Sequence, residues 1–144
     1  MLKGRLKENL LFGRSLSDKY LVSVVNDLGI DRIADQSDKG LDRPISEGGS
    51  GLSGGQRQMI SLGRVLIGSK NIWIFDEPTA SLDNHSQELF VNGLKSRMRA
   101  DDILIFSTHN IKLAMELSNR IIVLEGGKIS KDAPTSAVQV RKTA

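Results

Sequence analysis

Two short stretches of the sequence combine residue types that can bind a phosphorylated ligand and hydrolyse it. The first is Leu-Ser-Gly-Gly-Gln at positions 52–56, a glycine-rich turn followed by a helical pattern. The second is the apolar run at residues 72–75, which ends in the adjacent carboxylates Asp76 and Glu77. A helix N-terminus binds phosphate through its free N–H groups, and strand-end carboxylates can hold Mg²⁺ and orient water. Together the two stretches indicate nucleotide hydrolysis.

The glycine-rich turn can approach phosphate closely, because Gly54 and Gly55 have no side chains. Ser53 Oγ and the first N–H groups of the helix can donate to phosphate oxygens, and the helix dipole adds about 0.3–1 kcal/mol. A plain helix cap is the usual explanation of Ser-Gly-Gly. The five-residue word and its distance from the carboxylate strand favour phosphate binding instead. The turn is not a P-loop, because G-x-x-x-x-G-K-[ST] is absent from these 144 residues.

The carboxylates suit two different tasks. Asp76 suits Mg²⁺, and Glu77 is placed to polarise a water molecule for attack on a γ-phosphate.

His109 follows the next predicted strand. A lone histidine there is more typical of a structural role, but beside Asp76 and Glu77 it is a candidate sensor of the γ-phosphate or stabiliser of the attacking water. Ser-Leu-Asp at positions 81–83 forms a tight turn that by itself is typical of a helix N-cap.

Hydrophobic periodicity predicts the elements that position these groups. It predicts helices over residues 18–26, 30–34, 53–67, 84–99, 111–117 and 134–140, after a helical pattern near the start. The continuous apolar run at 72–75 is typical of a strand covered on both faces, and 102–106 predicts a second buried strand. Further strands are predicted over 120–124 and, shorter, over 128–131. Residues 35–51 are polar and glycine-rich, which predicts an exposed loop. The pattern predicts an α/β fold with a partly parallel sheet, whose ligands lie beyond the carboxyl ends of the strands.

Composition narrows the class of protein. The 144 residues fit at most one domain, and a net charge of +3 from scattered basic residues, with few aromatics, gives no expectation of a nucleic-acid partner. The absence of cysteine excludes disulfides and cysteine-based zinc sites, and two histidines cannot build a metal site alone. No apolar run approaches the roughly 18 residues of a membrane span, and we expect a soluble, cytosolic chain without a secretory signal.

The linked motifs closely resemble those of the ATP-binding-cassette (ABC) ATPases. In chain order, positions 52–56 resemble the signature sequence, residues 72–76 the Walker B strand, Glu77 the catalytic glutamate, residues 81–83 the D-loop, His109 the switch histidine and residues 121–127 the following hairpin. Order and spacing match over nearly the whole chain. The resemblance implies a partial P-loop NTPase-like core plus an ABC helical subdomain, divided as residues 1–70 and 71–144.

The resemblance also implies cofactors, partners and residue roles. ATP and Mg²⁺ would be bound at the interface of a head-to-tail dimer with a second nucleotide-binding domain. Asp76 would hold the metal, and Glu77 and His109 would act in hydrolysis. The expected nucleotide-binding residues are Ser53, Gly54, Gly55, Gln56, Ser81 and Asp83, of which the first four would serve the ATP of the partner domain.

Two segments point to exporters within the family. Residues 8–13 and 46–51 resemble exporters fused to a membrane-spanning domain, and the second would be the X-loop, which touches the coupling helices. The Asp83-Asn84 pair and the glycine-rich run at 47–51 are most similar to type I secretion exporters of proteins or peptides. This implies a place on the cytoplasmic side of the cell membrane, with the membrane-spanning domain as a partner.

Some family motifs do not occur in these residues. The Walker A loop, the adenine-stacking aromatic residue and the Q-loop glutamine would lie upstream of Met1, so the resemblance is to the C-terminal part of the domain. We therefore expect the isolated chain neither to bind ATP tightly nor to hydrolyse it. Two alternatives stay open: a non-catalytic module that lends its signature to a partner ATPase, and a soluble ABC-type ATPase of DNA repair or translation. The X-loop disfavours the second. Gly-Arg-Val at 63–65 also departs from the commoner Ala-Arg-Ala.

Overall fold

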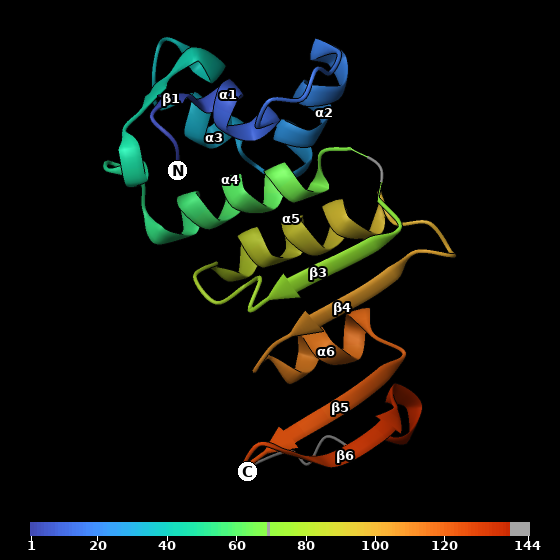
Figure 1. Ribbon diagram of the computed structural model, residues 1–144. Helices are drawn as coiled ribbons and strands as arrows, with labels where there is room; N and C mark the ends of the chain where they lie inside the picture. Colours follow the sequence, from blue (N-terminus) through green and yellow to red (C-terminus); the bar gives the residue numbers. More distant parts are fainter. Residues whose placement is uncertain (69, 139–144) are drawn as a thin grey trace.

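A computed structural model describes residues 1–68 and 70–138 (Figure 1). In chain order the elements are β1 (Gly4–Arg5), α1 (Leu6–Leu11), α2 (Asp18–Asp27), α3 (Asp31–Ala34), η1 (Gly40–Asp42), β2 (Pro44–Ile45), η2 (Glu47–Gly49), α4 (Gly54–Leu66), β3 (Ile72–Asp76), α5 (Asn84–Lys95), β4 (Ile103–Ser107), α6 (Ile111–Leu117), β5 (Arg120–Glu125), β6 (Lys128–Pro134) and η3 (Thr135–Ala137).

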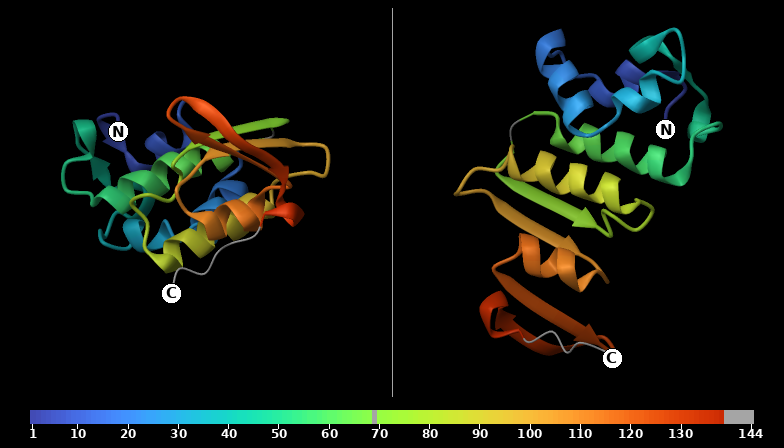
Figure 2. Two further views of the ribbon diagram at one scale, coloured as in Figure 1. Left: turned by 90° about the horizontal axis from the view of Figure 1, so that it is seen from below. Right: turned by 180° about the vertical axis from the view of Figure 1, so that it is seen from behind.

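The elements follow one another along the molecule. Helices α1 to α4 gather at the N-terminal end, α5 lies between α4 and β3, and the β5–β6 hairpin forms the opposite end (Figures 1 and 2). β3 and β4 are parallel, whereas β5–β6 and β1–β2 are antiparallel pairs. The α/β class with a partly parallel arrangement is confirmed.

The hydrophobic core is one cluster that extends from the N-terminal helices to β3. On α4, Met59, Ile60, Leu62 and Leu66 are buried at the spacing of a single helix face. Trp73 and Phe75 extend the core to the strand. The Phe75 ring meets the edge of the Phe90 ring on α5, with centroids 5.5 Å apart and the rings at 81°. This packing fixes β3 relative to the helices.

Two glycines allow α4 and α5 to pack closely around Leu28. A Cβ atom on Gly63 of α4 would lie 2.9 Å from Ile30 Cδ1 and 3.0 Å from Leu10 Cδ2. A Cβ atom on Gly93 of α5 would lie 2.9 Å from Leu28 Cδ2. The glycine at position 63 therefore fits a site in which an added Cβ atom would lie within 3.0 Å of two side chains.

The expectation that the strands are covered on both faces is wrong for the described residues. Ile72 and Ile74 of β3 and Ile103 and Ile105 of β4 are each more than half exposed. Because side chains alternate along a strand, these four share one face, while Trp73 and Phe75 point to the helices. Helices α5 and α6 lie on the same side of the strands (Figure 2, left). We call the other side, made by these four isoleucines, the open face.

Several predicted boundaries also change. The expected loop over 35–51 contains β2, and Ile45 is buried where it pairs with Gly4 of β1. The predicted helix over 84–99 ends at Lys95. The predicted helix over 134–140 is only the short turn η3, and positions 139 and 140 lie outside the described residues. Two-residue strands and single turns have too little periodicity to be recognised in a sequence.

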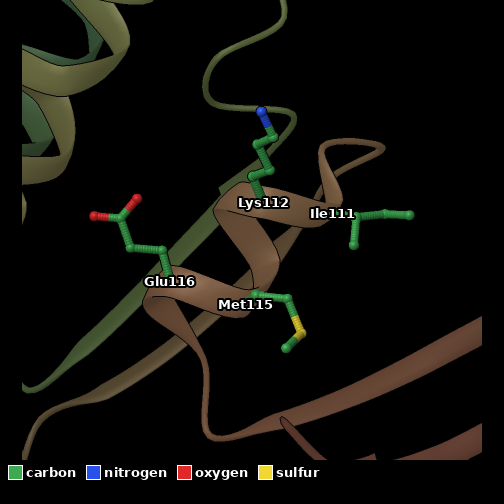
Figure 3. Close-up of a pocket in the computed structure, with 4 residues that line it drawn as sticks. All are labelled: Ile111, Lys112, Met115 and Glu116. Atoms are coloured by element: carbon green, nitrogen blue, oxygen red, sulfur yellow. The ribbon is translucent and has the colours of Figure 1, made fainter. Parts of the chain in front are cut away.

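Helix α6 carries a shallow hollow of about 420 Å³ that includes none of the predicted site residues. Figure 3 shows Ile111 and Met115 projecting to one side of this helix and Glu116 to the other. Glu116 forms an ion pair with Lys95 of α5, at 2.7 Å.

Within residues 1–68 and 70–138, no helix is long and apolar enough to cross a membrane.

Candidate functional site

The start of α4 is a capping box that leaves two N–H groups unused. Ser53 Oγ accepts a hydrogen bond from the Gln56 N–H (3.1 Å), and Gln56 Oε1 accepts one from the Ser53 N–H (2.9 Å). Two of the four free donors at the helix start are thereby satisfied. The N–H groups of Gly54 and Gly55 have no partner among the described residues, so they can donate to an anion.

The glycine-rich turn packs directly against the 81–83 turn. A Cβ atom on Gly55 would lie 2.8 Å from the Ser81 carbonyl oxygen, a contact that real Cβ atoms do not make. At Gly54 the nearest atom would be Ser81 Cβ, at 3.9 Å. The second glycine of the turn is therefore required by packing, and the two segments predicted to bind nucleotide are adjacent.

A groove of about 480 Å³ joins these segments. Five of the predicted residues line it: Ser53, Gly55, Gln56, Ser81 and Asp83. Arg32, Gln36 and His85 line it as well and were not predicted, because they come from distant elements or, as with His85, have a sequence context typical of a surface residue. The Ser86 N–H donates to Asp83 Oδ1 at 2.7 Å and lowers the pKa of that carboxyl, which keeps it ionised.

The carboxyl ends of β3 and β4 form a second group of polar residues. The parallel register places Asp76 opposite Ser107, and Ser107 Oγ donates to Asp76 Oδ1 at 2.5 Å. The Glu77 N–H in turn donates to Ser107, with 3.2 Å to both the carbonyl oxygen and Oγ. Ser107 was not predicted as a site residue, because its contact depends on strand register.

Glu77 and His109 lie next to each other. Glu77 Oε1 is 3.3 Å from His109 Nε2, and the exposed fractions of the two side chains are 34% and 100%. Glu77 has a φ of +44°, in the left-handed region that residues other than glycine rarely adopt. Strain of this kind persists where surrounding contacts hold it and is common at functional sites. The predicted base and the predicted histidine are therefore brought together.

Asp76 offers part of a magnesium site. Mg²⁺ is often bound by one or two carboxylates together with substrate phosphates and water. The exposed Asp76 carboxylate, fixed by Ser107, fits such a contribution. No cluster of three or more histidine and acidic side chains suited to a metal occurs in the part of the chain that the structure describes. A complete set of magnesium ligands would need oxygens from a bound nucleotide.

Gln58 connects the two groups and was also missed. It lies on α4, and its side chain bonds to the Glu77 carbonyl oxygen and to the Ser81 N–H. Its one signal in the sequence is its place two residues after Gln56, where it continues the signature-like stretch. Only the packing of α4 against the end of β3 shows its role.

A helix start with free N–H groups and carboxylates at a strand end are features that α/β nucleotide-binding proteins use. The family model described as "ABC transporter" matches residues 6–80. The chain belongs to the ABC transporter family.

Exporters are among its relatives. The chain is 36% identical over 140 residues to ABC transporter C family member 3 of Dictyostelium discoideum, covering 96% of this chain and 10% of that protein. It is 35% identical over 138 residues to the alpha-hemolysin translocation ATP-binding protein HlyB of Escherichia coli O157:H7, covering 88% of this chain and 19% of HlyB. The chain thus spans a tenth to a fifth of the length of these relatives.

A solved structure shares the fold. The structure of a bacterial Atm1-family ABC exporter with ATP bound superimposes with a TM-score of 0.82 and 22% sequence identity. The match covers 94% of this chain and 24% of that one. The expected partial P-loop NTPase-like α/β fold is therefore confirmed.

Proposed function

We propose that this chain is part of the nucleotide-binding domain of an ABC exporter, which hydrolyses ATP to drive transport across a membrane. The observation that carries the proposal is the pairing of Glu77 with His109 at the end of β3, 3.3 Å apart. A carboxylate and an imidazole at this distance can together orient a water molecule and accept its proton. The relatives that are exporters, HlyB among them, support transport as the purpose.

The groove beside α4 would serve the ATP of a second domain. Ser53 Oγ and the N–H groups of Gly54 and Gly55 would donate to its phosphate oxygens, and the cap made by Gln56 would hold them in place. Ser81 and Asp83 would line the same interface. This division of roles requires two domains arranged head to tail, each of which completes the nucleotide site of the other.

The strand end would serve the chain's own nucleotide. Asp76 would hold Mg²⁺, which supplies charge neutralisation at the phosphates when bound. Glu77 would take the proton of the attacking water, and His109 would hold the water or the γ-phosphate. The P-loop pattern is absent from these 144 residues, so the main phosphate cradle would come from residues outside them. The divisions at residues 1–70 and 71–144 are part of this proposal.

A membrane-spanning exporter domain would be the other partner, so that the chain works at the cytoplasmic side of the cell membrane. Within the exporters, we place the chain with those of the type I secretion kind. The 144-residue chain alone is expected to show no steady ATP turnover above a buffer blank, and clear turnover by the purified chain would contradict this.

The test is Glu77→Gln in the full-length transporter that carries this segment. Loss of a general base should lower kcat by about 10²–10⁴-fold, measured as phosphate release. Glu88→Gln, the same change at an exposed position on α5, is the matched control and should leave kcat unchanged. Wild-type turnover in Glu77→Gln would show that this residue is not the base.

A second candidate function has one observation in its favour. The capping box and the free N–H groups of Gly54 and Gly55 are complete within the described residues. The chain would then act as a non-catalytic module that lends its signature to another ATPase. Adding the purified chain should raise the ATPase rate of such a partner. Adding the chain that carries Gly55→Ala should leave that rate unchanged.

A further inference from the structure

We infer that Gln58 is a positioning residue that holds Glu77 in its left-handed conformation and links it to the glycine-rich turn. The inference rests on the proposed function, because it assigns Gln58 a role in the reaction of Glu77. Gln58 lies on α4, two residues after the capping glutamine. Its side chain is partly buried and reaches the end of β3.

Both ends of the Gln58 amide are used. Nε2 donates to the Glu77 carbonyl oxygen at 3.0 Å, and Oε1 accepts from the Ser81 N–H at 2.9 Å. A side-chain amide that bonds to two main-chain groups on different segments fixes their separation. Gln58 therefore fixes the distance between the end of β3 and the 81–83 turn.

The Glu77 main chain is held on both sides. Its N–H donates to Ser107, and its carbonyl oxygen accepts from the Ala80 N–H at 3.2 Å as well as from Gln58. A left-handed residue other than glycine needs such support. Without Gln58, one of the two bonds at the carbonyl is lost, and the carboxylate is less well fixed beside His109.

The contact also joins the two proposed nucleotide sites. α4 begins at the turn that would meet the ATP of the second domain, and Glu77 would act on the chain's own ATP. Gln58 is part of α4, and its side chain bonds to the main chain of Glu77. A shift of the start of α4 when ATP binds would therefore be transmitted to Glu77 through one side chain.

The experiment compares Gln58→Met and Gln58→Glu in the full-length transporter. Methionine keeps the length of the side chain and removes both bonds, whereas glutamate keeps the acceptor for Ser81 and removes the donor to Glu77. Loss of a neutral hydrogen bond that positions a reacting group predicts a fall in kcat of about three- to tenfold in both variants. The KM for ATP should stay within about twofold of the wild-type value, because Gln58 does not line the groove beside α4.

A matched control separates positioning from stability. Val65→Ala removes packing from the same helix at a half-buried position without touching Glu77 or Ser81. It should lower the Tm and leave kcat unchanged. The second control is the double variant Gln58→Met with Glu77→Gln, which should be no slower than Glu77→Gln alone, since Gln58 acts through Glu77.

Three results would overturn the inference. They are an unchanged kcat in Gln58→Met, a rise in KM without a fall in kcat, and a further loss in the double variant. Each of these leaves the proposed function intact when Glu77→Gln alone shows the expected fall in kcat. If Glu77→Gln turns over at the wild-type rate, the base role itself fails, and the inference fails with it.

Discussion

The helices at the N-terminal end bury most of their large apolar side chains, whereas β3 and β4 expose theirs on the open face. Leu10, Ile60 and Leu66 are fully buried, while Ile74 is 70% exposed. In register, Ile72 lies opposite Ile103 and Ile74 opposite Ile105, so the four side chains form a contiguous apolar surface. Surfaces of this kind mark interaction sites. The helical end thus lies inside the single core cluster, whereas β3 and β4 contribute only one of their two apolar faces to it.

The largest expected difference between the two regions is in the cost of truncation. Leu66→Ala should lower the free energy of unfolding by about 2–5 kcal/mol, because the side chain is fully buried. Ile74→Ala should change it by at most about 0.5 kcal/mol when the protein is dilute enough to be unassociated. Urea unfolding followed by circular dichroism measures both. Equal losses of unfolding free energy in the two variants would mean that the open face is covered in solution.

A smaller effect is expected where the two regions meet. Gly55→Ala forces a methyl group against the Ser81 carbonyl oxygen and should destabilise by about 1–3 kcal/mol, partly offset by the better helix propensity of alanine. Gly54→Ala is the matched control, because its Cβ would make an ordinary 3.9 Å contact. In thermal unfolding, the Tm of Gly54→Ala should be higher than that of Gly55→Ala. The reverse order would show that the two turns are not packed as described.

The open face itself should govern self-association more than stability. Replacing Ile74 and Ile105 with serine should change unfolding by no more than about 0.5 kcal/mol per site and reduce association of the chain in sedimentation velocity. Val22→Ser, at an exposed position on α2, serves as control and should leave association unchanged. Association that persists in the double variant would locate the interaction elsewhere.

The smallest expected effect is on stability at acid pH, through Asp102. The Arg99 N–H and Trp73 Nε1–H donate to Asp102 Oδ2 and lower the pKa of that carboxyl below its ordinary value of 3.8. Because the folded pKa is the lower one, this stabilisation is present above the unfolded pKa and is lost as the pH falls through the folded pKa. Asp102→Asn should therefore flatten the decline of the urea midpoint as the pH falls below about 4, near the unfolded pKa of 3.8. An unchanged slope would show that the two bonds do not stabilise the ionised form.

The sequence predicted most of the longer elements. Ser17 caps α2, Asp83 caps α5 and α6 spans the predicted residues, because caps and helical periodicity are local signals. It did not predict the open face, since an apolar run reveals that a strand can be buried and not which element covers it. The β1–β2 pair was missed because each strand has two residues.

The site was predicted in part. The sequence identified Glu77 and His109, which lie in contact, and Ser53 and Ser81, which line one groove. Their roles stay predictions. Gln58 continues the signature-like stretch, but its contacts could not be predicted, because they join residues 19 and 23 positions away along the chain. Contacts of this kind depend on how a helix packs against a strand end, and a pattern of residue types contains no information about that.

The packing of Leu28 against Gly63 and Gly93 has a mechanical consequence. Its side chain lies between the two helices, with Cδ1 3.6 Å from a Cβ atom placed on Gly63 and Cδ2 2.9 Å from one placed on Gly93. Tightly packed interiors have low compressibility and transmit strain. A force applied to the N-terminal helices would therefore displace α5 and β3 with little damping, so that this joint behaves as a stiff coupling and not as a hinge.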